Sequence, residues 1–377
     1  MQKMTIFAVA SMFAATPAFA DNPPAATGAT PHPPKPAAVA PPSHPAPVKQ
    51  TAPASTPESR SAAALALTHE PTYDEGTAQR LKEAAFSYSD IAVRGGWPTI
   101  PAEAKFAPGM AGEHDELLRK RLSMSGDLDS DKATGAYDDA VVEALKRFQS
   151  RHGLAPTGTM TPRTLAALNV PVHKRIKQLE ASLQRLEAMK FSFGQRYVVV
   201  NLPATYAEAI ENDVVVRRYR VVVGKTEKPS PTLTAEITSV VLNPTWTVPA
   251  SIAKSEISAH MRRDPGYLSR MHMEVLDAHD RPIDPHAVDW SGTHAPNFTV
   301  RQHSGTFNAL GAVKIDMPNP YSVYMHDTQQ RSLFSNDYRF DSHGCSRVDN
   351  VRDLAAWLLA DQPKWNRAAI DATIAGG

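Results

Sequence analysis

The only cysteine of the 377-residue chain, Cys345, lies among other side chains that could take part in catalysis. Its segment, residues 340–350, reads FDSHGCSRVDN, and His326 ends the earlier segment YSVYMH. A thiolate is a strong nucleophile, and an imidazole can take the proton of a thiol and return it to a leaving group. Backbone N–H groups beside the thiol can stabilise the oxyanion of a tetrahedral intermediate. These residue types together indicate acyl transfer through a covalent intermediate.

The sequence around Cys345 also suggests how the thiol is activated. The segment VRDLAAWLLADQ follows shortly afterwards and predicts an amphipathic helix, so we expect the cysteine at or near a loop-to-helix junction. A helix N-terminus and neighbouring cations such as His343 and Arg347 lower the pKa of a thiol. Two alternatives remain open on position alone. One is a buried, inert cysteine, and the other is a zinc site of His326, His343 and Cys345 that lacks an evident fourth ligand.

The segment YSVYMH, residues 321–326, predicts a strand with His326 near its end. Successive side chains of a strand point to opposite faces, which places Tyr324 on the same face as His326 and Asp327 on the other. We therefore expect a backbone carbonyl, rather than the Asp327 carboxylate, to orient the imidazole. Asn243 and Trp246 could also lie near the site, although turn formation and core packing are their favoured roles.

The elements that must position these residues are mainly strands. From about residue 195 the apolar period changes to that of β-structure in YVVVNLP, DVVVRRYRVVVG and LTAEITSVVLNPTW, and IEND is a hairpin signal. Residues 251–304 interrupt this pattern with a helical segment, IAKSEISAHMRRDPGYLSRM, and a loop-like one, HDRPIDPHAVDW. Such an insertion between strands is typical of a lid over a binding site.

A small three-helix module is predicted before the β-domain. Its first helix ends at Gly126, its second has Gly153 at a C-cap-like position, and its third begins with Thr161 as N-cap and Pro162. The second helix has one apolar face, formed by Val141, Ala144, Leu145 and Phe148. On these features alone a plain helical spacer is the alternative.

Two further helices are predicted around this module. AQRLKEAAFSYSDIAV precedes it and ends before the helix-breaking segment GGWPTIP, and VHKRIKQLEASLQRLEAM follows it. The second of these has a one-sided stripe of Ile176, Leu179, Leu183 and Leu186, so we expect it to connect the domains by packing against one of them rather than to form a coiled coil.

The N-terminal residues predict export. Lys3, an apolar run and the small-residue sequence AFA before Asp21 are typical of a secretory signal peptide, with an uncleaved anchor as the alternative. The Pro-rich residues that follow predict an extended tether, with a docking ligand as the alternative. A formal charge of +1 and 21% charged residues give no basis for nucleic-acid binding. No later segment is apolar enough to span a membrane.

The segment HDTQQRSLFSNDYRFDSHGCSRV resembles the signature of L,D-transpeptidases with a YkuD-type catalytic domain: a His, a gap, then Ser-His-Gly-Cys, one residue and Arg. GGWPTIP, VVVGKTEKPSPTL, VVLNPTWTVPASI and GTFNALGAVKIDMPNPYSVYMHDT resemble the larger proteobacterial members, which have a helical scaffold, a peptidoglycan-binding module and a lid. ALKRFQSRHGLAPTGTMTPRTLAAL resembles the peptidoglycan-binding module itself. RQHSGTFNALG departs from the pattern, with His-Ser in place of a Pro-Gly-like pair, which could alter the hinge of the lid.

The resemblance implies a role for each candidate site residue. Cys345 matches the nucleophile and His326 its general base and acid. The N–H groups of Gly344 and Cys345 would line the oxyanion hole, His343 would shape the pocket, and Arg347 would support the loop or meet a substrate carboxylate. Ser342 could be part of the hydrogen-bonded structure of the loop, and the strand alternation lets Tyr324 line the site. No cofactor and no metal ion is implied.

The resemblance also implies the reaction. Cys345 would form a thioester with a stem tetrapeptide of peptidoglycan and release D-Ala, and an amine of a neighbouring stem would then complete a cross-link. Water as acceptor would give an L,D-carboxypeptidase, and a D-amino acid would give exchange. The alternative is a wall-binding protein with an idle catalytic domain. Carbapenems should acylate the same thiol. The expected partners are peptidoglycan stem peptides and glycan, together with other cell-wall enzymes, in the periplasm.

The expected architecture is an α+β multidomain chain with a mainly-β, YkuD-like catalytic domain, a helical lid insertion and the three-helix module. The expected divisions are a signal peptide (1–20), a disordered tether (21–70), a helical scaffold segment (71–112), the peptidoglycan-binding-like module (113–171), a connecting helix (172–194) and the catalytic domain (195–377) with its lid (251–304).

Overall fold

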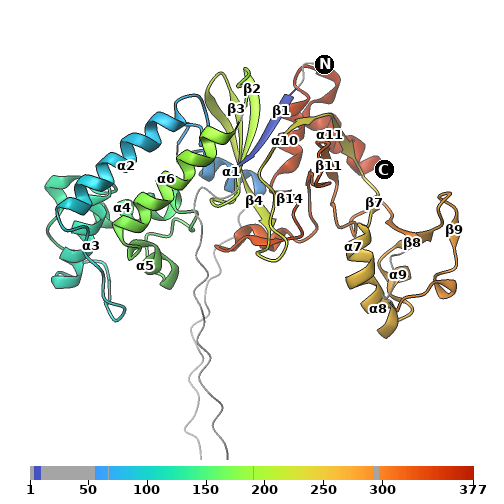
Figure 1. Ribbon diagram of the computed structural model, residues 1–377, viewed down its shortest axis with the longest axis horizontal. Coiled ribbons are helices and arrows are strands. Elements are labelled where there is room, and N and C mark those ends of the chain that lie inside the picture. The colour runs from blue at the N-terminus through green and yellow to red at the C-terminus, as the bar shows by residue number, and fades with distance from the viewer. Residues whose placement is uncertain (1–3, 10–55, 67, 190, 292–296) are drawn as a thin grey trace, which may run out of the picture.

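The computed structural model describes residues 4–9, 56–66, 68–189, 191–291 and 297–377. Helices α2 to α6 lie on one side of a central sheet, and the lid insertion lies on the other side (Figure 1). This arrangement confirms the α+β multidomain class with a mainly-β catalytic domain. Within the described ranges, no helix is both long and apolar enough to cross a membrane.

The helical part consists of a helix pair and the predicted three-helix module. The pair is α2 (Thr77–Val93) and α6 (Val172–Ala188), which pack against each other. The module comprises α3 (Glu113–Met124), the short η1 (Ser130–Lys132), α4 (Asp139–Arg151) and α5 (Pro162–Leu168). All of these helices except η1 were predicted from apolar periodicity and capping residues.

The module folds around the face that the sequence predicted. Val141, Ala144, Leu145 and Phe148 of α4 are fully buried in one cluster with residues of α3 and α5. The Thr161 hydroxyl accepts a hydrogen bond from the backbone N–H of Thr164 and caps α5, as expected. Gly153 has φ +70°, the left-handed conformation in which glycine ends a helix without strain.

The central sheet has ten strands, in the order β5-β1-β2-β3-β4-β14-β12-β11-β6, with β13 paired to β4 off this path. The strands are β1 (Met4–Val9), β2 (Arg196–Asn201), β3 (Tyr206–Glu211), β4 (Val214–Gly224), β5 (Leu233–Ile237), β6 (Ser239–Leu242), β11 (Val313–Asp316), β12 (Met325–His326), β13 (Phe340–Ser342) and β14 (Ser346–Val348). Short 3-10 helices η4 (Arg331–Ser335) and η5 (Pro363–Trp365) lie in the connections.

The valine-rich strands are buried on both faces. In β2, Val198 and Val200 pack in the cluster that contains α10 (Val351–Leu358) and α11 (Arg367–Gly376), whereas Tyr197 and Val199 pack on the opposite side with Leu186 of α6. A strand with both faces covered is apolar at every position, which explains the continuous run of valines.

The hairpin predicted at IEND is present, but its first strand was missed. Asn212 and Asp213, with φ 50° and 63°, form the turn between β3 and β4. The missed strand β3, YAEAIE, carries the buried Glu208, which pairs with Arg218 at 2.9 Å. The glutamate interrupts the apolar pattern by which a buried strand is predicted. The arginine that compensates its charge lies on the neighbouring strand.

The predicted tether is wrong at its C-terminal end. Residues 57–65, which were assigned to the disordered tether 21–70, form helix α1 (Pro57–Leu65), which packs on β4. Arg60 of α1 makes a buried two-point ion pair with Asp349, at 2.5 and 2.8 Å. Residues 10–55, with the rest of the expected tether and part of the expected signal peptide, lie outside the described residues.

Strand β1 falls within the predicted signal peptide. It lies between β2, to which it is parallel, and β5, to which it is antiparallel. The signal peptide stays a prediction, and its cleavage would remove β1 from the sheet.

The insertion is a small domain rather than helices followed by a loop. It contains β7 (Trp246–Thr247), α7 (Ala250–Ile252), the π-helix η2 (Ala253–Ile257), α8 (Ser258–Arg263), α9 (Tyr267–Arg270), β8 (Met273–Leu276), β9 (Pro282–Ile283), η3 (Pro285–Ala287) and β10 (Thr299–Gln302). Its strands form a separate sheet, β7-β10-β8-β9, which covers an apolar cluster of its own that includes Ile257, Met261 and Val300.

The module also contacts the catalytic domain directly. The Ala155 N–H donates a hydrogen bond to the Asp337 carboxylate at 3.1 Å, and the Arg163 guanidinium lies 5.3 Å from the centre of the Tyr338 ring. Residues 337 and 338 belong to the loop that leads into β13 and then to Cys345. The module is therefore docked on the segment in front of the cysteine.

Candidate active site

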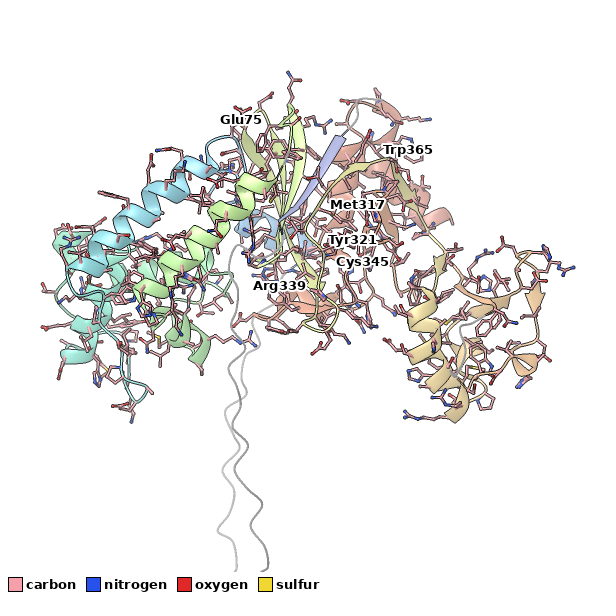
Figure 2. The ribbon with its side chains drawn as sticks, in the orientation of Figure 1. Glu75, Met317, Tyr321, Arg339, Cys345 and Trp365 are labelled. Atoms are coloured by element: carbon pink, nitrogen blue, oxygen red, sulfur yellow. The ribbon has the colours of Figure 1, made fainter. Side chains whose placement is uncertain are left out.

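Cys345 lies in the turn between β13 and β14, half-buried, on the part of the central domain that faces the lid in the view of Figure 2. The expected loop-to-helix junction is wrong, because strand β14 separates the cysteine from α10, which begins at Val351. The predicted helix exists, but its N-terminus does not adjoin the sulfur.

The turn at Cys345 is held by two serine hydroxyls. Ser342 Oγ donates to the Cys345 carbonyl at 2.6 Å and accepts from the Gly344 N–H at 3.1 Å. Ser230 Oγ donates to the Gly344 carbonyl at 2.7 Å. Gly344 has φ +119°, which a side chain would strain. Because the Gly344 N–H is already bonded to Ser342, the Cys345 N–H is the remaining donor of the two amides expected at an oxyanion hole.

His326 is buried at the end of β12, only 6% exposed. Its Nδ1 contacts the backbone carbonyl of Asp327. The Asp327 carboxylate instead accepts hydrogen bonds from the Thr328 N–H at 2.7 Å and the Ala312 N–H at 3.0 Å, and pairs with Arg331 at 2.8 Å. The carbonyl partner agrees with the strand alternation expected from the sequence, and it fixes the orientation of the ring.

Tyr324 connects the imidazole to the thiol. Its ring centre lies 5.7 Å from that of His326, edge to face, and both its backbone and its phenol act on the Cys345 thiol by lowering the thiol pKa. The Trp246 side chain, in β7 just before the expected lid, acts on the same phenol by lowering the phenol pKa, an effect that burial outweighs. Burial raises the pKa of the Tyr324 phenol, so the hydroxyl stays protonated. Tyr324 and Trp246 are therefore part of the surroundings of the cysteine.

The thiol and the imidazole are both held neutral. Burial raises the pKa of the Cys345 thiol, and the hydrogen bonds from Tyr324 and the charges of Arg347 and Lys314 oppose this only in part. Burial, followed by the positive charge of Arg347, lowers the pKa of His326 to about 3. The expectation that local cations lower the thiol pKa overall is therefore wrong, because removal of water outweighs them.

The remaining predicted residues lie around this pair. Arg347 of β14 is in register with His326 of β12 and donates to the Gln330 side chain at 2.8 Å. His343 Nε2 lies 2.7 Å from Glu256 Oε1 of the lid. Asn243 instead donates to the carbonyls of α11, at 3.2 Å for Ile374, which fits the turn-forming alternative.

Sequence reasoning missed Ser230 and Glu256. Ser230 lies in the segment PSPTL that was quoted for its resemblance, but nothing local indicates a contact with Gly344. Glu256 is 87 positions from His343 and lies in a helix of the insertion. Among the described residues, no group of three or more His, Cys, Asp and Glu side chains could hold a metal ion, so the zinc alternative has no ligand set there.

Comparison with known proteins finds two domain families in the chain. Residues 195–364 match the family YkuD, described as "L,D-transpeptidase catalytic domain", and residues 112–168 match a family described as "Putative peptidoglycan binding domain". A curated relative from Haemophilus influenzae, described as "Putative L,D-transpeptidase", is 31% identical over 187 residues. That match covers 49% of this chain and 37% of the relative, so the chain spans little more than a third of the relative's length.

Two solved structures are also similar. The L,D-transpeptidase (Yku) from Stackebrandtia nassauensis is 14% identical, with 67% of this chain and 89% of that chain covered and a TM-score of 0.31. The L,D-transpeptidase (residues 123–326) from Xylanimonas cellulosilytica is 18% identical, with coverages of 71% and 95% and a TM-score of 0.20.

The family matches confirm the resemblance seen in the sequence. Residues 195–364 therefore match an L,D-transpeptidase catalytic domain of the YkuD type, and the residues that match a peptidoglycan-binding module precede them.

Proposed function

We propose that the protein is an exported L,D-transpeptidase that forms peptidoglycan cross-links in the periplasm through a thioester on Cys345. The single observation that carries this proposal is the contact of Tyr324 with both the Cys345 thiol and the His326 imidazole, inside a domain that matches this family. A nucleophile and a base that share one neighbour can act as a pair.

In the proposed reaction the Cys345 thiol and the His326 imidazole are both neutral at rest, and His326 acts as a general base. It takes the thiol proton while the sulfur attacks the carbonyl before the terminal D-Ala of a stem tetrapeptide. The Cys345 N–H stabilises the oxyanion. The C–N bond then breaks, the imidazolium returns its proton to the leaving amine of D-Ala, and the thioester remains. The Asp327 carbonyl keeps the ring oriented throughout.

The second half of the reaction resolves the thioester. An amine of a neighbouring stem attacks the same carbonyl, the C–S bond breaks as the C–N bond forms, and the proton lost by the amine returns to the sulfur through His326. Ser342 and Ser230 fix the turn at Gly344. This turn would keep the thioester carbonyl next to the Cys345 N–H. The lid limits access of water, which favours the amine as acceptor.

The test uses the purified protein with a disaccharide-tetrapeptide and analysis of the products by mass spectrometry. A cross-linked dimer with release of D-Ala is expected, and Cys345→Ala should abolish both. Tripeptide alone would indicate an L,D-carboxypeptidase, and incorporation of an added D-amino acid would indicate exchange. A folded, reduced protein that gives none of these products and no Cys345-dependent adduct with a carbapenem would establish the idle wall-binding alternative.

A further inference from the structure

Glu256 is the lid residue that contacts the loop carrying the nucleophile. Its carboxylate lies 2.7 Å from His343 Nε2, two residues before Cys345, and 3.7 Å from Lys228 Nζ in the connection between β4 and β5. Glu256 belongs to η2, which packs in the separate apolar cluster of the lid through Ala253 and Ile257. The contact therefore joins two units that each have their own core.

Both partners of Glu256 belong to one fixed assembly around the cysteine. The connection that carries Lys228 is bonded to the nucleophile turn through Ser230, which donates to the Gly344 carbonyl, and through the Lys225 N–H, which donates to the Ser342 carbonyl at 3.0 Å. At Gly224 a side chain would meet backbone atoms at 2.3 and 2.4 Å, so this connection folds tightly on itself. Glu256, which lies on the lid, is therefore the member of this contact that would move away when the lid opens.

We propose that Glu256, with His343 and Lys228, forms a clasp that closes the lid over Cys345 and so directs the thioester to an amine rather than to water. The proposal rests on the proposed function, and Glu256 acts in it as a positioning residue, because it touches neither the sulfur nor the base.

The strength of the clasp suits repeated opening. The Glu256 side chain is 44% exposed, and an exposed ion pair stabilises only weakly. A lid held by such a contact can admit a wall strand and release it again. While it is closed, water has less access to the thioester; when it opens, the C–S bond can be broken by water, with formation of a C–O bond and a free tripeptide.

The experiment compares wild-type protein with Glu256→Gln, which keeps the shape of the side chain and removes its charge. With disaccharide-tetrapeptide as substrate, the ratio of dimer to tripeptide should fall about 2- to 5-fold, the change that loss of one exposed pair allows. The rate of carbapenem acylation at Cys345 should stay within about 2-fold of wild type, because neither the thiol nor His326 is altered.

Two further variants separate the clasp from a general effect on the lid. Glu274→Gln removes a carboxylate of β8 that faces Arg301 within the lid, at 4.0 Å, and should leave the ratio unchanged. Glu256→Lys should lower the ratio further than Glu256→Gln, and addition of Lys228→Glu should recover part of the loss by restoring opposite charges. A ratio for Glu256→Gln equal to that of wild type, or a double variant no better than Glu256→Lys, would overturn the clasp.

Hydrogen exchange tests the clasp without turnover. The amides of residues 253–263 should exchange faster in Glu256→Gln than in wild type, and equal rates would overturn the proposal. Wild-type protein that yields neither dimer nor tripeptide would defeat the proposed function instead, which distinguishes the two failures.

Discussion

The Tyr324 ring stands edge to face with the His326 imidazole, with the ring centres 5.7 Å apart, while its side chain lowers the pKa of the Cys345 thiol. Tyr324 therefore contacts both halves of the proposed pair at once. Its hydroxyl, together with the Tyr324 backbone, is placed to stabilise the thiolate as it forms, which matters because the thiol is otherwise removed from water.

Tyr324→Phe should slow acylation of Cys345 without unfolding the domain. The phenol–thiol hydrogen bond becomes charge-assisted as the thiolate forms, and such bonds contribute about 1.5–3 kcal/mol, or roughly 10- to 100-fold in rate. The measurement is the rate of carbapenem adduct formation by intact-protein mass spectrometry, with the thermal melting curve as control. An unchanged rate would show that the hydroxyl plays no part in activating the sulfur.

The pH dependence of Cys345 alkylation should reflect a neutral resting pair. Since burial raises the pKa of the thiol, the rate with iodoacetamide should rise by about tenfold per pH unit through neutrality and continue to rise above about pH 8.5, the value for free cysteine. Because the pKa of His326 is about 3, no second inflection is expected near the ordinary histidine value of about 6.5. A plateau reached already between about pH 5 and 7 would indicate a preformed thiolate.

Arg60→Met should destabilise the catalytic domain. The substitution leaves the Asp349 carboxylate, which is fully buried, without its guanidinium partner, and loss of one member of a buried pair costs about 3–5 kcal/mol. Thermal unfolding followed by circular dichroism measures the effect. The surface variant Arg94→Met, which removes an exposed pair with Asp90, is the matched control and should change stability by less than about 1 kcal/mol.

Phe148→Ala should disable the module while leaving the thiol reactive. Phe148 is fully buried among the apolar residues of α3, α4 and α5, and its truncation costs about 3–5 kcal/mol. Sedimentation with purified cell walls should show weaker binding, whereas carbapenem acylation of Cys345 should remain near the wild-type rate. Equal wall binding by the variant would mean that the module is a spacer and that the catalytic domain alone holds the wall.

Local signals predicted most of the helices. The capping by Thr161, the glycine stop at Gly153 and the apolar face of α4 act over a few residues, so the sequence displays them directly. The strand that ends at His326 was also predicted, although only Met325 and His326 belong to it in the structure. Residues 321–324 are coil because the loop around Asn319, which donates to the Val323 carbonyl, holds them in a turn.

Features set by distant contacts could not be predicted. The direction of the Cys345 pKa shift depends on burial by surrounding elements, which outweighs the adjacent cations visible in the sequence. Helix α1 is polar and proline-bounded, and it is ordered against β4 with the aid of an ion pair to Asp349, a residue 289 positions away. The contact between Glu256 and His343 likewise exists only once the insertion has folded back on the catalytic loop.

The contacts of Ala155 and Arg163 with residues 337 and 338 restrict the distance between the module and the Cys345 sulfur. Modules on a flexible linker sample many separations, and linker length then sets the local concentration of the second ligand. Here a glycan strand gripped by the module would stand at one fixed spacing from the sulfur. The protein would then acylate stem peptides at a fixed distance from the glycan strand that its module binds.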